Sequence, residues 1–191
     1  MKRVIILCCL AVFSFGTVFS QEDGDQVPTI DKSPLDISYF PNNYPVLKIQ
    51  DKSPEPLVTR VIYSRPFLNG RPIIGGLLEY GKLWRLGANE ATEIHFYRDV
   101  KIGNKKVEKG RYTLYAIPGK EKWTMIVNKE TDTWGAFLYD EKKDVVRIDV
   151  PVVENGKLAE ALSLTFEKTS GGCNLLLLWD NLKVSMPIAY N

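Results

Sequence analysis

The sequence predicts an all-β protein, built as a single antiparallel β-sandwich of which a jelly roll is one form. Two observations predict this fold. From Leu57 onward, about nine short segments alternate apolar and polar residues, as strands with one buried face do. Turn-forming groups such as Lys101-Ile102-Gly103-Asn104 and Ser170-Gly171-Gly172 separate them, and no segment carries an apolar stripe at helical spacing. A closed barrel with an internal pocket is the alternative.

Residues 1–20 are predicted to form a signal peptide. Two basic residues precede an apolar run, Val4 to Val18, that is shorter than the roughly 20 residues of a membrane span. Small residues then precede a cleavage site ahead of Gln21. An uncleaved anchor and a lipoprotein acylated at Cys8 or Cys9 are the alternatives, although both cysteines lie inside the apolar run. The mature chain is therefore expected to be periplasmic or secreted, with no stable membrane span.

Cleavage changes the charge and the cysteine count. The whole chain carries 25 basic and 23 acidic residues, one histidine and three cysteines. Two basic residues and two cysteines leave with the signal, so the mature chain is formally neutral and keeps Cys173 alone. Neutrality argues against nucleic acid or an anionic membrane as a partner, since both attract basic proteins. Without a disulfide, one hydrophobic core must hold about 170 residues, which suits one domain.

Residues 21–56 are predicted to form a proline-rich arm ahead of a domain at residues 57–191. Six of the eleven prolines lie in the arm, and proline is excluded from helix interiors and central strands. Apolar residues between Pro34 and Ile49 favour an arm laid along the domain, with an edge strand at Val46 to Ile49. A disordered tether is the alternative.

The strands of the domain are rich in β-branched and aromatic residues. In chain order we expect them at Leu57 to Tyr63, Ala91 to Tyr97, Arg111 to Pro118, Lys122 to Asn128, Trp134 to Tyr139, Val145 to Val150, Ala161 to Glu167, Asn174 to Asp180 and Lys183 to Ala189. Glu154-Asn155-Gly156 is a predicted turn. The run Leu175 to Trp179 is apolar on both faces, which predicts a central strand. We expect Cys173, at its start, to be buried, and Trp123 and Trp179 to lie in the core.

Tyr63 to Thr92 breaks this alternation and predicts a long irregular loop after the first core strand. It mixes arginines with aromatic residues and glycines, and it contains most of the candidate ligand-binding set. That set is Arg65, Arg71, Trp84, Arg85, Asn89 and Glu90, joined by Trp134 from a later segment. Arginine forks bind carboxylate or phosphate oxygens, and indole faces stack on apolar ring faces. The structural alternative is a partly buried Arg85 to Glu90 ion pair that pins the loop, with Arg65 and Asn89 bonding to loop carbonyls.

The sequence lacks the residue patterns that several kinds of catalytic and binding site require. One histidine, one mature cysteine and scattered carboxylates make no zinc or calcium set. A Ser-His-Asp arrangement would have to use His95, and no serine lies in a nucleophile elbow. Gly75-Gly76 lacks the lysine spacing and the helix of a phosphate-binding loop. No metal and no cofactor are therefore expected.

A series of motifs resembles a known family. In order, they are YSRP, EYGKLWRLGANEAT, KGRYTLYAIPG, WTMIVNK, WGAFLYD and LLLLWDNLKVSMPI. Together they are similar to the DUF2911 family, uncharacterised exported proteins of Bacteroidetes-type bacteria, between residues 50 and 190. The resemblance implies an envelope or secreted domain and supplies no reaction. It also implies that His95 occupies a variable surface position, which lowers its standing as a catalyst.

Two function classes follow. The first is a binding module of the cell envelope that recognises a glycan, an anionic small molecule or a protein partner through the surface from Arg65 to Glu90. The alternative is a metal-independent hydrolase or isomerase that uses Glu90 as acid or base and arginines for charge stabilisation. A concave pocket where Glu90 meets a second polar group favours the enzyme, and a shallow aromatic face favours the module.

Overall fold

The computed structural model of the chain describes residues 29–53 and 55–190. The predicted signal peptide, residues 1–20, lies outside them, and so do Cys8 and Cys9. Within the described residues, no helix has the length and apolar character needed to cross a membrane.

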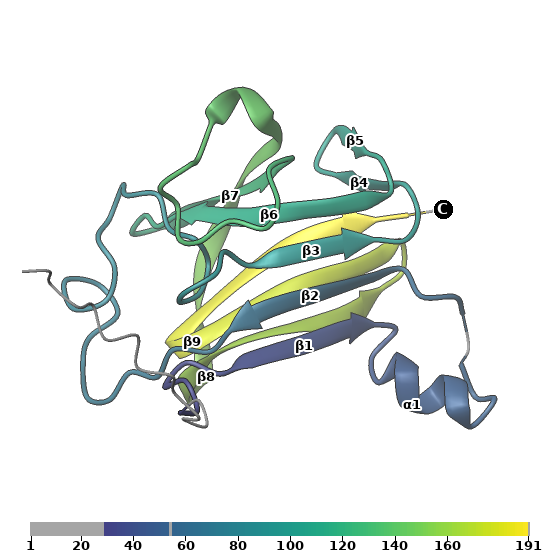
Figure 1. Cartoon of the computed structure of the whole chain (residues 1–191), viewed down its shortest axis with the longest axis horizontal. Helices are drawn as coiled ribbons and strands as arrows, with labels where there is room; N and C mark the ends of the chain where they lie inside the picture. Colours follow the sequence, from purple (N-terminus) through teal and green to yellow (C-terminus); the bar gives the residue numbers. More distant parts are fainter. Residues whose placement is uncertain (1–28, 54, 191) are drawn as a thin grey trace, which may run out of the picture.

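Strands dominate the described chain, with one short α-helix and one 3₁₀ turn (Figure 1). The elements are β1 (Leu35–Phe40), α1 (Tyr44–Ile49), β2 (Thr59–Ser64), β3 (Glu93–Phe96), β4 (Val100–Ile102), β5 (Lys105–Val107), β6 (Gly110–Ile117), β7 (Lys122–Asn128), the 3₁₀ helix (Glu141–Lys143), β8 (Asp144–Thr169) and β9 (Gly172–Ala189).

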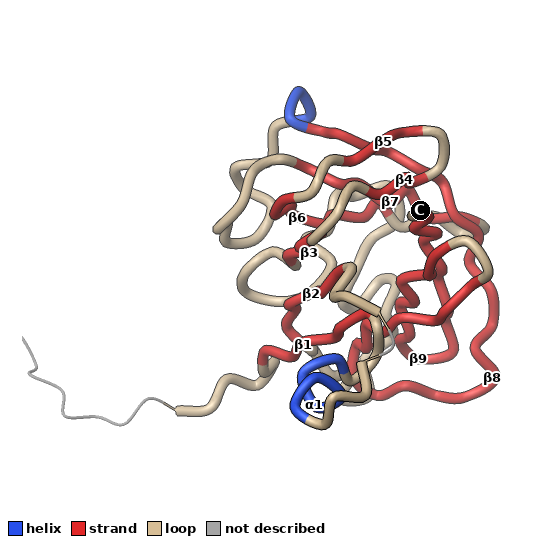
Figure 2. The backbone as a smooth tube through the Cα atoms, turned by 90° about the vertical axis from the view of Figure 1, so that its right-hand side faces the viewer, coloured by secondary structure: helices blue, strands red, loops and turns tan. Residues whose placement is uncertain are grey.

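The strands form one antiparallel sheet in the order β1-β2-β3-β6-β7-β8-β9-β4-β5. The all-β, antiparallel prediction is therefore confirmed. The sheet curls, so that β1, β2, β3 and β6 face β8 and β9 across the core (Figure 2). The two layers are parts of one continuous sheet. Since β1 and β5 are its end strands, strand pairing does not close it into the barrel considered as the alternative.

β8 joins the two layers. Its residues 144–151 pair with β7, and its later residues pair with β9. The register with β9 shifts on both sides of Ala159, close to the predicted turn Glu154-Asn155-Gly156. Such an irregularity leaves residues unpaired and bends the strand without ending it. The segments predicted as separate strands on either side are thus continuous within β8, and the two last predicted strands are likewise continuous within β9.

Large aromatic side chains fill the space between the layers. Trp84 stacks on Trp179 with ring centroids 5.7 Å apart and packs edge-on against Trp123 at 5.9 Å. All three are buried, which confirms the core positions predicted for Trp123 and Trp179. Cys173 is buried as well, and burial raises the pKa of its thiol to about 12. A thiol in that environment is unreactive.

Two predicted strands are wrong. Val46 to Ile49 lies in α1, because Pro45 fits the first turn of a helix better than a ladder of hydrogen bonds. The edge strand of the arm is β1 instead, which pairs with β2 along its whole length. Trp134 to Tyr139 is a series of turns: Gly135 has a φ of 66°, and Phe137 is 83% exposed. A positive φ of this size is a turn conformation and not a strand one.

The segment between β2 and β3 is irregular, as predicted, yet it is fixed at several points. Phe67 forms a bridge with Ala161 of β8, and Trp84 forms one with Ala116 of β6. The Trp84 Nε1 also donates to the Gly87 carbonyl at 3.0 Å. These contacts make the loop a fixed part of the fold that can hold side chains in place.

Candidate binding site

The outward face of the sheet carries a row of polar side chains across four strands. Tyr39 of β1 pairs with Arg60 of β2, Arg60 pairs with His95 of β3, and His95 pairs with Arg111 of β6. Directly paired residues point to the same face of a sheet. The next residue along β2, Val61, is fully buried on the opposite face. Strand alternation thus brings four residues from distant parts of the chain onto one surface.

A groove of about 450 Å³ lies on this face and is called the outer-face groove below. Its lining residues are Leu35, Arg60, Ile62, Tyr63, Glu90, Ala91, Glu93, His95, Arg111, Asp132 and Thr133. Its volume lies within the roughly 300 to 1,000 Å³ usual for ligand pockets. Apolar side chains from β1 and β2 and charged side chains from β3 and β6 therefore border one concave surface.

Two carboxylates neutralise Arg111 in the outer-face groove. Its Nη2 lies 2.5 Å from Glu93 Oε2 and 2.5 Å from Asp132 Oδ1. Hydrogen bonds to these carboxylates raise the pKa of Arg111, and the bond from Arg111 lowers the pKa of Asp132. Two charge-assisted bonds thus occupy the Arg111 guanidinium group.

His95 lies in the outer-face groove, where it pairs with Arg60 across the strands. Its ring stacks on Tyr97 with centroids 4.1 Å apart. Burial lowers the pKa of His95, and the neighbouring Arg60 charge lowers it further. Its Nδ1 is enclosed and has no hydrogen-bond partner among the described residues. Arg60 Nε is likewise enclosed without a hydrogen-bond partner, and within the described chain no ion pair neutralises Arg60. Cross-strand neighbours that both lack partners are costly to hold in a fold.

Three of the sequence-predicted residues meet at the rim of the outer-face groove. The Ala91 amide donates to the Thr133 carbonyl at 2.9 Å, and the Gly135 amide donates to the Asn89 carbonyl at 2.9 Å. These bonds place Glu90 beside Trp134. A second hollow of about 350 Å³, lined among others by Asn89 and Trp134, shares Leu35 and Glu90 with the groove. Trp134 is 60% exposed there, so its indole face is available to a ligand.

Three other predicted residues make contacts within the fold, away from the outer-face groove. Arg65 donates to the Leu162 carbonyl and the Ser163 hydroxyl of β8 and pairs with Asp36 of β1. Among the residues that the structure describes, Arg71 donates only to carbonyls of its own loop. Trp84 lies in the core. The structure thus separates these three from the outer-face groove.

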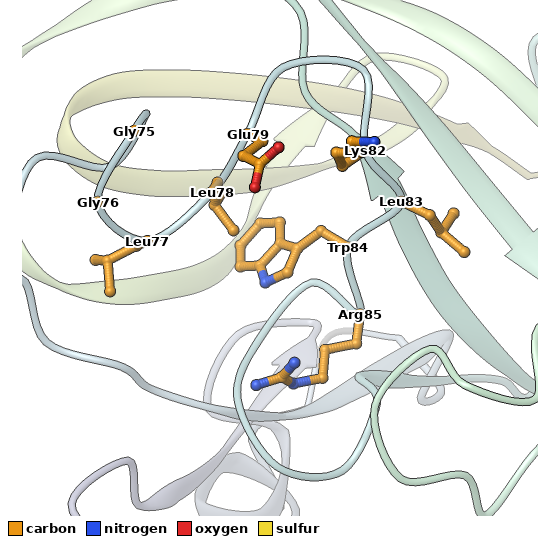
Figure 3. A pocket seen from close by; sticks show the side chains of 9 residues that line it. All are labelled: Gly75, Gly76, Leu77, Leu78, Glu79, Lys82, Leu83, Trp84 and Arg85. Carbon is orange, nitrogen blue, oxygen red and sulfur yellow. The ribbon is translucent and has the colours of Figure 1, made fainter.

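Arg85 lies apart from both groups. No ion pair joins it to Glu90 in residues 29–53 and 55–190, so the structural alternative of an Arg85 to Glu90 clamp does not hold. Arg85 instead lines a separate pocket of about 290 Å³ beside Trp84 (Figure 3).

Sequence reasoning missed Arg60, Glu93 and Arg111, and it set His95 aside. Each stands at an outward position of a strand, where a charged residue is ordinary. Their one common signal is that they occupy the polar positions of β2, β3 and β6. This signal identifies a shared surface only once the register of the strands is known.

The chain belongs to the family described as "Protein of unknown function (DUF2911)", whose model matches residues 48–188. The predicted resemblance is therefore confirmed. No curated protein and no solved structure matches the chain. In the described part of the chain, no group of three or more histidine, cysteine or acidic side chains is placed to hold a metal ion.

Proposed function

We propose that this protein is an exported binding module of the cell envelope that takes a neutral glycan in the outer-face groove. Export is supported by the basic start, short apolar run and small residues of positions 1–20. Ligand recognition is supported by a concave surface in which fixed donors and acceptors lie next to an exposed indole.

The neutralised state of Arg111 is the observation that carries this proposal. A site for an anion keeps an arginine fork unoccupied for the ligand. Here Glu93 and Asp132 already occupy Arg111, and Glu90 adds a third carboxylate against the single unpaired Arg60. The formal charge of the groove, with two arginines and three carboxylates, is minus one. Charged groups that are paired with one another still offer hydrogen bonds to hydroxyl groups, which is the chemistry of a sugar.

Trp134 supplies the apolar part of such recognition. Sugar rings have an apolar face that stacks on aromatic side chains, and Trp134 stands 60% exposed in the hollow that adjoins the groove. The adjoining hollow extends the surface from Glu90 to Trp134, which gives room for more than one sugar unit.

A metal-independent hydrolase is the second candidate, because the outer-face groove brings Glu90 together with Glu93 and Asp132. Glycoside hydrolysis needs one carboxyl group that stays protonated near neutral pH as a general acid. Arg111 lowers the pKa of Asp132, so that carboxyl group is a poor proton donor, and Glu93 is already paired with Arg111. This favours binding over catalysis.

The test is glycan binding by the mature chain, residues 21–191, on an array and then by calorimetry. Trp134→Ala should weaken binding of a neutral oligosaccharide at least tenfold, about 1.4 kcal/mol. Phe137→Ala is the matched control, because it removes an exposed aromatic from the same turn outside the groove. It should leave binding unchanged.

Glu93→Gln tests the role assigned to Arg111, since it frees part of that fork for an anion. Relative to the parent, this variant should gain affinity for an acidic oligosaccharide over its neutral counterpart. Preference of the parent for acidic ligands would contradict the proposal, as would equal effects of the Trp134 and Phe137 substitutions. Release of new reducing ends during incubation, lost in Glu90→Gln, would show that the hydrolase is the correct reading.

A further inference from the structure

The loop between β2 and β3 encloses a pocket of about 290 Å³, called the loop pocket below, which shares no lining residue with the outer-face groove. Figure 3 shows Gly75 and Gly76 on one side of the Trp84 indole and Lys82 on the other. The Trp84 ring itself lies between the Glu79 carboxylate and the Arg85 guanidinium group in this view.

Arg85 is a half-buried cation that the fold does not satisfy. Its Nε is enclosed and has no acceptor, and its side chain makes no hydrogen bond or ion pair with the residues that the structure describes. Burial lowers the pKa of Arg85, and no carboxylate acts in the opposite direction. By contrast, Arg65 and Arg111 both have a carboxylate within 3.0 Å. A desolvated charge without a partner destabilises a fold, so this position is unfavourable unless something outside the chain pairs with it.

The backbone around Arg85 holds the side chain in this position. Trp84 exchanges backbone hydrogen bonds with Ala116, and the Arg85 carbonyl accepts from the Thr92 amide at 3.1 Å. The flanking Trp84 and Leu86 side chains are buried in the core. The backbone position of Arg85 is therefore fixed relative to the core, which limits the groups that its side chain can reach.

The wall of the loop pocket opposite Lys82 is preformed. The amides of Leu77 and Leu78 both donate to the Ile73 carbonyl, and the Gly75 amide donates to the Leu78 carbonyl at 2.8 Å. A side chain at Gly76 would place its Cβ 2.5 Å from the Pro72 carbonyl oxygen, so glycine is needed there. A preformed wall lowers the ordering cost of binding.

We propose that the loop pocket binds a small organic carboxylate, with Arg85 as the group that pairs with its oxygens. The lining of the pocket is more polar than apolar, and its leucine and tryptophan side chains supply the smaller apolar part, which suits a small apolar body next to the charged end of a ligand. Lys82 adds a second positive charge, whereas Glu79 opposes the approach of a doubly charged anion such as phosphate. The volume of this pocket lies just below the roughly 300 to 1,000 Å³ usual for ligand sites, so it suits only a small ligand. This site does not depend on the glycan proposal.

Benzoate, acetate and inorganic phosphate are suitable probes for the mature chain. Their binding is measured by shifts of the amide resonances of residues 75–85 and by the rise of the melting temperature with ligand concentration. Benzoate should shift these resonances and should bind at least tenfold more tightly than either acetate or phosphate. Arg85→Gln should abolish the shifts. Arg71→Gln is the matched control, because Arg71 is an exposed arginine of the same loop whose guanidinium bonds to its own loop.

Lys82 is exposed, so Lys82→Gln keeps the proposal testable if Arg85→Gln does not fold. This variant should weaken the affinity for benzoate several-fold. Absence of shifts at residues 75–85 would overturn the proposal, and so would benzoate binding that survives Arg85→Gln. Phosphate binding more tightly than benzoate would overturn the assignment to carboxylates. Substitutions that abolish benzoate binding should leave the resonances of the outer-face groove unchanged, because the two sites share no lining residue. Failure of this proposal and failure of the glycan proposal are therefore distinguishable.

Discussion

Arg65→Ala should weaken the connection between the two layers of the sheet. Arg65 follows β2, and its Nε donates to the Leu162 carbonyl at 3.0 Å while Nη2 donates to Ser163 Oγ at 2.8 Å. Its Nη1 pairs with Asp36 Oδ2 of β1 at 3.0 Å. One side chain thus ties the end strand β1 and the loop to the opposite layer.

The expected loss follows from these three contacts. Hydrogen bonds from a charged group contribute roughly 1.5 to 3 kcal/mol each when buried. The side chains of Arg65 and Asp36 are 35% and 41% exposed, so solvent screens them and the lower end applies. We expect the free energy of unfolding to fall by about 3 kcal/mol from the two hydrogen bonds, with at most about 1 kcal/mol more from the ion pair. For a chain of this length, that lowers the melting temperature by about 6 to 12 °C.

Thermal and urea unfolding followed by circular dichroism measure this loss. Arg71→Ala is the control, because that exposed arginine bonds only to the Leu68 and Phe67 carbonyls of its own loop. It should lose less than about 1 kcal/mol. Asp36→Asn isolates the ion pair. If Arg65→Ala melts within about 2 °C of the parent, or Arg71→Ala is as damaging, the reasoning from hydrogen bonds to stability is refuted.

Two further predictions concern His95 and Gly172. Because the folded state lowers the pKa of His95, its contribution to stability is present above the unfolded pKa of about 6.5 and is lost as the pH falls from there toward the folded pKa. His95→Gln should flatten the pH dependence of the urea unfolding midpoint between about pH 7 and 5. An unchanged pH dependence in this variant would contradict the prediction. Gly172→Ala would place a Cβ 2.1 Å from the Ile188 carbonyl oxygen and should cost more than about 2 kcal/mol. Gly171→Ala meets nothing within 4 Å and should stay within about 0.5 kcal/mol, so similar losses for both would contradict the close approach.

Much of the fold could be predicted from the sequence because alternation and turns are local signals. β7 was predicted with its observed bounds, since the segment Lys122 to Asn128 is bounded by a tight turn before it and a polar segment after it. The errors arose where a local signal was overridden. The turn expected at Glu154-Asn155-Gly156 is absorbed into β8 as an irregularity, because β9 continues alongside it and pairs on both sides. In Trp134 to Tyr139 the apolar residues suggested a strand, yet Gly135 turns the chain and leaves Phe137 exposed.

The candidate site was harder to predict because its residues are brought together by register. Arg85 and Glu90 are five residues apart, yet they belong to different pockets, since the loop between them turns back at Leu86 and Asn89, both with positive φ. Arg60 and Arg111 are distant in sequence, yet His95 pairs with each of them. A shift of one residue in that pairing would point these side chains into the core.

The arm before the family region also contributes to the outer-face groove. The family match begins at residue 48, whereas β1 ends at Phe40, and Leu35 of β1 lines both the groove and the adjoining hollow. The edge of β2 that pairs with β1 would otherwise be an unpaired strand edge, which proteins cover or shorten. The arm therefore covers this edge and completes one wall of the groove, so the shape of the groove and the stability of the sheet both depend on residues outside the family match.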